Sequence, residues 1–177
     1  MGDFQRALTL IKEVEQFYEK RDDFEAVNDT RYLRALIMDD LGNYSLAQKL
    51  YDTLLANAYK SGDKVSISTM LVAKANSLLQ ADKTEEAKSL IYEAGPMLDS
   101  SFDPDSWSLW QLLKAKADYA DGNYESALVH VKRAEPRMSG QDNFRYLAWI
   151  QNIKAKTLAK LGHWQQAYEA NIAYNNT

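Results

Sequence analysis

Two histidines and several neighbouring carboxylates are the residues of this sequence that could do chemistry. His130 and His163 are the only histidines, and the chain has no cysteine, so a zinc site would need carboxylates from several helices. His163 falls where a turn between helices is expected, and His130 is expected to face outward or between structural repeats. We therefore assign both histidines a structural role and expect no metal site and no cofactor.

Neighbouring carboxylates occur at three places: Asp39-Asp40, Glu85-Glu86, and Asp103 with Asp105. Sequence neighbours on a helix do not face each other, so these residues are expected to be solvated or to cap helices rather than to form an acid–base pair. No metalloprotease motif, glycine-rich phosphate loop or nucleophile elbow is present. We expect no catalytic residue and no enzymatic activity. Trp107, Trp110 and Trp149 lie at helical spacing with other apolar residues, which favours packing over a ligand platform.

The amino-acid composition argues against further classes of function. The chain has 177 residues, 46% of them hydrophobic, with seven glycines and three prolines, which suits a soluble all-helical protein. A net charge of −4 argues against a general nucleic-acid binder. No apolar run approaches the roughly 18 residues of a membrane span, so membrane insertion is not expected. The compartment stays open, because a chain without cysteine fits the periplasm and the cytoplasm equally.

A six-residue motif, residues 122–127 (GNYESA), organises the chain because related segments recur every 40 residues. The final alanines of the five copies are Ala7, Ala47, Ala87, Ala127 and Ala167. A second column of alanines keeps the same period: Ala35, Ala75, Ala115 and Ala155. A fixed period of this size is typical of stacked helix pairs.

The motif has the chemistry of a tight turn between two helices. Its glycine can adopt the left-handed backbone that ends a helix, and the asparagine that follows (Asn43, Asn123) can cap the next helix. Alanines on both helices allow the two axes to approach closely. The third copy has Asp82 in place of glycine and Thr84 in place of the aromatic residue, so we expect a looser turn there.

The order Ala-x6-Gly-x-Tyr-x-x-Ala resembles the tetratricopeptide repeat (TPR), although the usual period of that family is 34 residues. The family's early tryptophan is not kept, since its column holds Arg31, Leu71, Gln111 and Gln151. The chain is most similar to the long repeats of bacterial regulators. The resemblance implies an all-α, right-handed superhelical solenoid of antiparallel helix pairs, with about nine helices.

We expect one continuous array over residues 1–177. Residues 2–20 form the second helix of a truncated repeat, and four full repeats span residues 24–60, 64–99, 104–138 and 143–177. Helices are expected at about 4–20, 24–41, 44–60, 64–81, 84–98, 104–121, 124–138, 143–161 and 164 to the end. Asp103 followed by Pro104 predicts a capped helix start, and residues 139–142 are predicted as a connector.

Both ends of the array are expected to be uncapped. Tyr168, Ile172 and Tyr174 in the last helix have no later repeat to pack on, which suggests a segment of a longer protein that forms weak homodimers through its exposed ends. The alternative is a small complete protein that buries these ends by dimerising.

The TPR resemblance also implies a concave groove lined by the first helix of each pair. Carried onto this chain, the predicted partner-binding residues are Tyr32, Asp39, Asn76, Gln80, Leu112, Lys116, Tyr119, Trp149, Asn152, Lys156 and Lys160. The charge along this wall changes from acidic, at Asp39 and Asp40, to basic, at Lys116, Lys156 and Lys160. The lysine, asparagine and arginine clamp of chaperone-binding relatives does not map onto these columns.

The resemblance therefore implies a module that binds a protein or peptide in its groove. Such arrays occur as sensory or scaffold segments of larger bacterial signalling proteins of the diguanylate cyclase (GGDEF) or histidine kinase type, often in the periplasm. The alternatives are the TPR region of a transcriptional regulator and a stand-alone assembly adaptor.

The repeat register predicts that the two alanine columns are buried against each other. Replacing Ala115 or Ala127 with leucine should therefore cost roughly 1–3 kcal/mol of stability through overpacking. Thermal melts measure this loss, and an unchanged melting temperature in either variant would contradict the register.

Overall fold

The computed structural model describes residues 2–101, 103–138 and 144–175. Across these residues the chain forms nine α-helices and one short 3-10 helix, and no strand. The α-helices are α1 (Gly2–Glu19), α2 (Phe24–Asp40), α3 (Tyr44–Ser61), α4 (Lys64–Gln80), α5 (Thr84–Ala94), α6 (Pro104–Ala120), α7 (Tyr124–Met138), α8 (Phe144–Lys160) and α9 (Trp164–Asn175). The predicted all-α class is confirmed, and most predicted boundaries lie within two residues of the observed ones.

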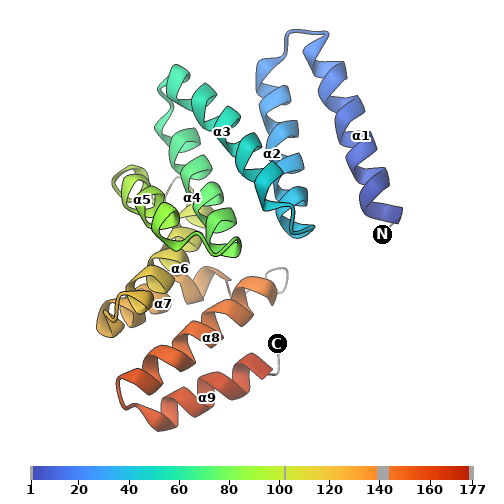
Figure 1. Ribbon diagram of the computed structural model, residues 1–177. Helices are drawn as coiled ribbons and strands as arrows, with labels where there is room; N and C mark the ends of the chain where they lie inside the picture. Colours follow the sequence, from blue (N-terminus) through green and yellow to red (C-terminus); the bar gives the residue numbers. More distant parts are fainter. Residues whose placement is uncertain (1, 102, 139–143, 176–177) are drawn as a thin grey trace. The chain divides into compact units, whose positions relative to one another are not determined.

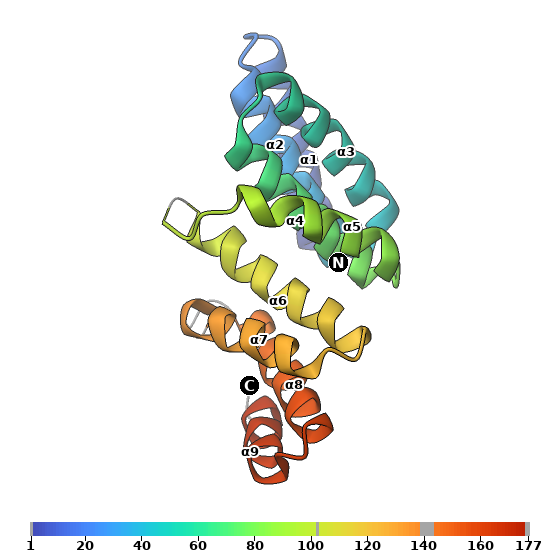
Figure 2. The ribbon, with the colours of Figure 1, turned by 90° about the vertical axis from the view of Figure 1, so that its left-hand side faces the viewer.

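The helices form two compact units, Met1–Leu90 and Ile91–Thr177, which divide within α5. In the first unit, α1 packs against α2, α2 against α3, and α3 against α4 (Figure 1). In the second unit, α6 packs against α7, both contact α8, and α8 packs against α9 (Figure 2). Helices that follow one another in the chain are therefore neighbours within each unit.

Both alanine columns are buried in the four paired repeats, as the register predicts, whereas Ala7 on α1 is half-buried. Seven of the eight alanines in the paired repeats are at most 8% exposed and Ala155 is 9% exposed. In the first unit, Ala35 and Ala47 share one core cluster with Leu50, Tyr51 and Leu54. Alanine therefore occupies the closest contact, and larger apolar side chains fill the space beside it.

The turns between paired helices use the left-handed backbone that the motif predicts. Gly122 has φ +79°, and no atom lies within 4 Å of the position that a Cβ would take. The backbone conformation, rather than crowding, thus favours glycine there. The Asn43 side chain accepts a hydrogen bond from the Leu46 N–H (3.4 Å), which confirms the predicted cap on α3.

The looser turn expected at Asp82 is seen only in one hydrogen bond, since the Asp82 N–H lies 3.4 Å from the Leu79 carbonyl, against 2.9–3.2 Å for the equivalent bonds in the glycine turns. Asp82 itself adopts the left-handed conformation, with φ +59°, and the Lys83 N–H donates to the Leu78 carbonyl at 2.9 Å. The equivalent bond from Asn43 to Met38 is 2.8 Å. Aspartate is among the non-glycine residues that tolerate this region, so the turn closes without glycine.

Three other boundaries can be compared with the sequence-based expectation. The first motif's Gly2 lies inside α1 rather than in a turn. Helix α5 ends at Ala94, not at Leu98, and Gly95–Met97 form the 3-10 helix. Pro96 explains this end because it lacks the N–H that an α-helix needs. Asp103 accepts from the Ser106 N–H (3.0 Å) ahead of Pro104, which confirms the predicted start of α6. The connector at 139–142 lies outside the described residues.

Because Asp82 occupies a backbone region that costs an L-residue free energy, Asp82→Gly should raise the free energy of unfolding by roughly 0.5–1 kcal/mol. Chemical denaturation measures the change. Ala81→Gly is the matched control: the adjacent Ala81 has φ −91°, so glycine there should only destabilise. A loss of stability in both variants would contradict the argument.

Candidate partner-binding surface

Lys116 on α6 and Trp149 on α8 form the clearest contact among the predicted groove residues. The Lys116 Nζ lies 3.8 Å from the Trp149 ring centroid, which is a cation–π arrangement. The Trp149 ring also meets Tyr146 edge-on, with centroids 5.6 Å apart. The tryptophan is thus held between an aromatic neighbour and a cation from the adjacent helix.

No carboxylate balances the charge of Lys116 among the described residues. Burial, together with the positive charge of Lys156, lowers the pKa of Lys116 to about 8. At neutral pH most Lys116 side chains still carry a proton, so the site holds a positive charge that is partly shielded from water. An anion that reached both lysines would relieve their mutual repulsion.

The other predicted groove residues of the second unit differ in accessibility. Lys156 and Lys160 are exposed on α8, and Asn152 is half-buried. Tyr119 is half-buried too, and its ring lies 5.4 Å from that of Tyr124. Leu112 is completely buried in the core of this unit, so its assignment to the binding surface is wrong. The Leu112 side chain packs in the core cluster with Ala115, Val131 and Ile150 rather than facing solvent.

In the first unit, Asp39 at the acidic end of the predicted wall is half-buried and hydrogen-bonded within the fold. The Asp39 carboxylate accepts hydrogen bonds from the Tyr51 hydroxyl (2.9 Å) and the Ser77 hydroxyl (2.6 Å). Burial raises the pKa of Asp39, although the two hydrogen bonds oppose the shift. This carboxylate therefore links α2, α3 and α4, while Asp40 is exposed.

Tyr32 lines a pocket of about 350 Å³ in the first unit, together with Asp29 and Thr69. The Tyr32 ring lies 6.3 Å from that of Tyr51. Asn76 and Gln80 are half-buried on α4. The structure thus places Tyr32 at a hollow of the first unit, and its role in partner binding stays a prediction.

A polar network between α6 and α7 was missed by the sequence reasoning. Asp118, 2% exposed, forms an ion pair with Lys114 and accepts a hydrogen bond from the Ser126 hydroxyl (2.7 Å). His130 Nε2 lies 3.6 Å from the same carboxylate, and its Nδ1 lies 2.5 Å from Gln111 Oε1. His130 thus faces α6, not outward. The sequence did hold a signal for this network. At multiples of 40 from Asp118 the other repeats have apolar residues, Met38, Leu78 and Leu158, so a charge in this column stands out.

This network lacks the arrangement of a catalytic site. Ser126 donates to Asp118 rather than to His130, so no base faces a nucleophile. Within the described residues, no cluster of three metal-ligating side chains occurs. In the same part of the chain no helix is long and apolar enough to span a membrane.

The last helix exposes the apolar side chains that the sequence predicts to be uncovered. Tyr168, Ile172 and Tyr174 are 66%, 41% and 38% exposed. Trp164 is exposed as well. Their accessibility agrees with the expectation, and self-association through this helix stays a prediction.

No protein-family model matches the chain, and no curated protein matches it. Among solved structures, the chain is similar to BtubC (BKLC) from P. vanneervenii, with a TM-score of 0.75 and 19% sequence identity. The match covers 98% of this chain and 73% of BtubC. At this identity the similarity shows a shared fold.

His130 makes the stability of the protein depend on pH. Burial lowers the pKa of His130 below its ordinary value of 6.5; Asp118 opposes the shift, and Lys114 and Arg133 add to it. Below pH 6.5 the unfolded chain therefore takes up a proton that the folded chain binds less readily, so stability falls as the pH drops. His130→Gln should reduce this loss.

Chemical denaturation between about pH 8 and about pH 5 measures the effect. His163→Gln is the control, because His163 is exposed on the turn before α9 and its replacement should leave the dependence in place. An unaltered pH dependence in His130→Gln would contradict the assignment.

Proposed function

We propose that this chain is a non-catalytic, tetratricopeptide-type module that binds a protein or peptide segment. Support comes from the 40-residue period, the helix pairs and the burial of both alanine columns. In this proposal the pairs continue as a right-handed superhelical solenoid. The first helix of each pair then contributes to one concave wall. The similarity to BtubC supports the shared helical fold.

The observation that carries the proposal is the stacking of Lys116 on Trp149 without a carboxylate partner. A partly buried cation without an acid partner contributes little to the stability of the fold, whereas an incoming anion can use it. Lys156 adds a second positive charge on the same wall, and Trp149 and Tyr119 offer apolar ring surface. The preferred ligand is an extended segment with alternating acidic and aromatic side chains.

In the wider role that we propose, the module is the sensory or scaffold segment of a larger bacterial signalling protein of the diguanylate cyclase or kinase type. This step rests on the resemblance of the long repeats. A transcriptional regulator or a stand-alone assembly adaptor would use the same wall, and the compartment is not assigned.

Reversing both lysine charges should abolish ligand binding. The probe is a short fluorescein-labelled peptide of alternating glutamate and tryptophan residues, followed by fluorescence anisotropy at rising salt. The wild-type protein should bind it with an affinity that falls as salt screens the charges. The double variant Lys116→Glu with Lys156→Glu should lose both the binding and its salt dependence.

The matched control reverses two lysines outside the wall, Lys12 on α1 and Lys49 on α3, both exposed. This variant has the same net charge as the test variant and should retain binding. If the two double variants behave alike, net charge rather than the Lys116–Lys156 site determines the interaction. Undiminished binding by the test variant would refute the proposed site.

A further inference from the structure

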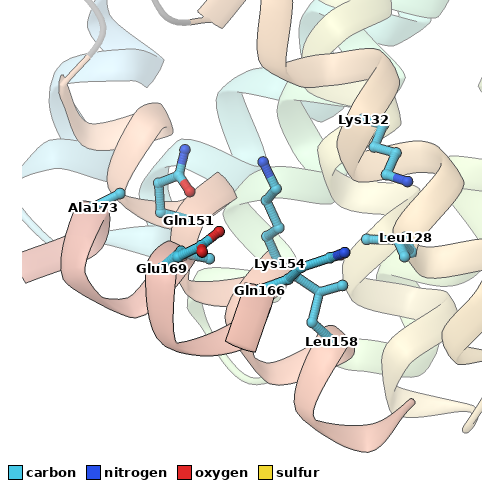
Figure 3. A pocket seen from close by; sticks show the side chains of 9 residues that line it. Leu128, Lys132, Gln151, Lys154, Leu158, Gln166, Glu169 and Ala173 are labelled. Atoms are coloured by element: carbon cyan, nitrogen blue, oxygen red, sulfur yellow. The ribbon is translucent and has the colours of Figure 1, made fainter. Parts of the chain in front are cut away.

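A hollow of about 460 Å³ lies between α7, α8 and α9. Figure 3 shows the side chains around it. They are Leu128, Lys132, Gln151, Lys154, Leu158, Gln166, Glu169, Ala170 and Ala173. Leucine and alanine side chains supply apolar surface, and charged or amide groups from all three helices surround it. None of these residues belongs to the predicted groove.

Ala170 leaves the room for this hollow. Residues at multiples of 40 before it are Leu10, Leu50, Leu90 and His130, all larger side chains. Leu50 is 7% exposed and belongs to the core of the first unit. Ala170 packs in the corresponding place beside Leu158. Because alanine lacks the atoms that fill this space elsewhere, the surface between α7 and α9 stays open.

A cation without an acid partner also lies beside the hollow. The column of Lys132 holds Lys12, Asp52, Tyr92 and Ile172 in the other repeats, and its one acid, Asp52, forms an ion pair with Lys74 (2.5 Å). In the second unit the equivalent cation, Lys154, binds Glu135 instead (2.8 Å). Lys132 is exposed and has no acid partner among the described residues.

An acid from another helix completes the charge pattern. Glu169 on α9 is exposed and accepts one weak hydrogen bond, from the Gln165 amide at 3.3 Å. Lys132 comes from α7, so a cation and an anion from different helices border the same apolar surface (Figure 3). The two side chains form no ion pair with each other. A small ligand that carries both charges and an apolar group matches this arrangement.

We propose that this hollow binds a free aliphatic α-amino acid of about the size of leucine. The ligand carboxylate pairs with Lys132, its ammonium group pairs with Glu169, and its side chain lies on Leu128, Leu158 and Ala170 in the space that larger residues fill in other repeats. The site is separate from the peptide-binding wall, so neither proposal depends on the other.

Isothermal titration of the full chain with L-leucine tests the site. We expect saturable binding that weakens at least about tenfold in Lys132→Gln and in Glu169→Gln, since each loses one charged contact. Ala170→Leu should abolish binding by filling the hollow. Lys49→Gln, at an exposed lysine on α3, is the matched control and should bind leucine like the wild type.

Analogues of leucine test each of the three proposed contacts separately. Leucinamide lacks the carboxylate, N-acetyl-leucine lacks the ammonium group, and alanine lacks the larger side chain, so each should bind more weakly than leucine. N-acetyl-leucine binding as tightly as leucine would overturn the proposal, because a peptide C-terminus would then be the better ligand. The absence of saturable leucine binding, or unchanged binding in Lys132→Gln, would also overturn it. Lys132 is exposed, so this variant tests the site even if Ala170→Leu alters the fold.

Discussion

Close contact between two helices at a pair of alanines is the constraint on which the rest of this structure depends. Ala115 and Ala127 are completely buried, and any larger residue would separate α6 from α7. Once this contact is set, the 40-residue period determines which face of each helix turns inward. Residues one position after the first alanine column, such as Lys116, therefore lie at the edge of the core, where a side chain can still meet an incoming ligand.

A second interaction recurs between neighbouring pairs and was not expected from the sequence. One column is basic in every repeat: Arg34, Lys74, Lys114 and Lys154. Three of these residues bind an acid on the preceding helix, namely Glu15, Asp52 and Glu135. Glu15 and Glu135 share one column, since they lie 120 residues apart, but Asp52 lies in another, so the period reveals the pairing only in part. Most of these pairs are partly exposed and contribute about 0–1 kcal/mol each. Glu15 is only 7% exposed and is bound by Arg31 and Arg34, so replacing those two arginines would leave a buried charge uncompensated.

The helices could be predicted because their turns depend on local sequence. The site could be predicted only in part because packing depends on residues that are distant in the sequence. The glycine turns and the Asp103 cap depend on a few adjacent residues. By contrast, Leu112 and Asp39 occupy groove columns of the family, yet one is buried and the other is bound by residues of two further helices. A column specifies a face of a helix, and the partner across that face decides whether a side chain stays accessible. The division into two units, within α5, has no signal in the repeat pattern either.

Departures from the repeat therefore carry more functional information than the repeat itself. A column that holds the same kind of residue in every pair is explained by packing, as the alanines are. Asp118 departs toward a buried charge, and it is matched by Lys114 and Ser126 within its own helix pair. Ala170 departs without such a match because it removes volume, and Lys132 beside it has no acid partner among the described residues. A change that the surrounding protein does not compensate is the kind that a ligand can complete, which is why the hollow between α7 and α9 differs in character from the network around Asp118.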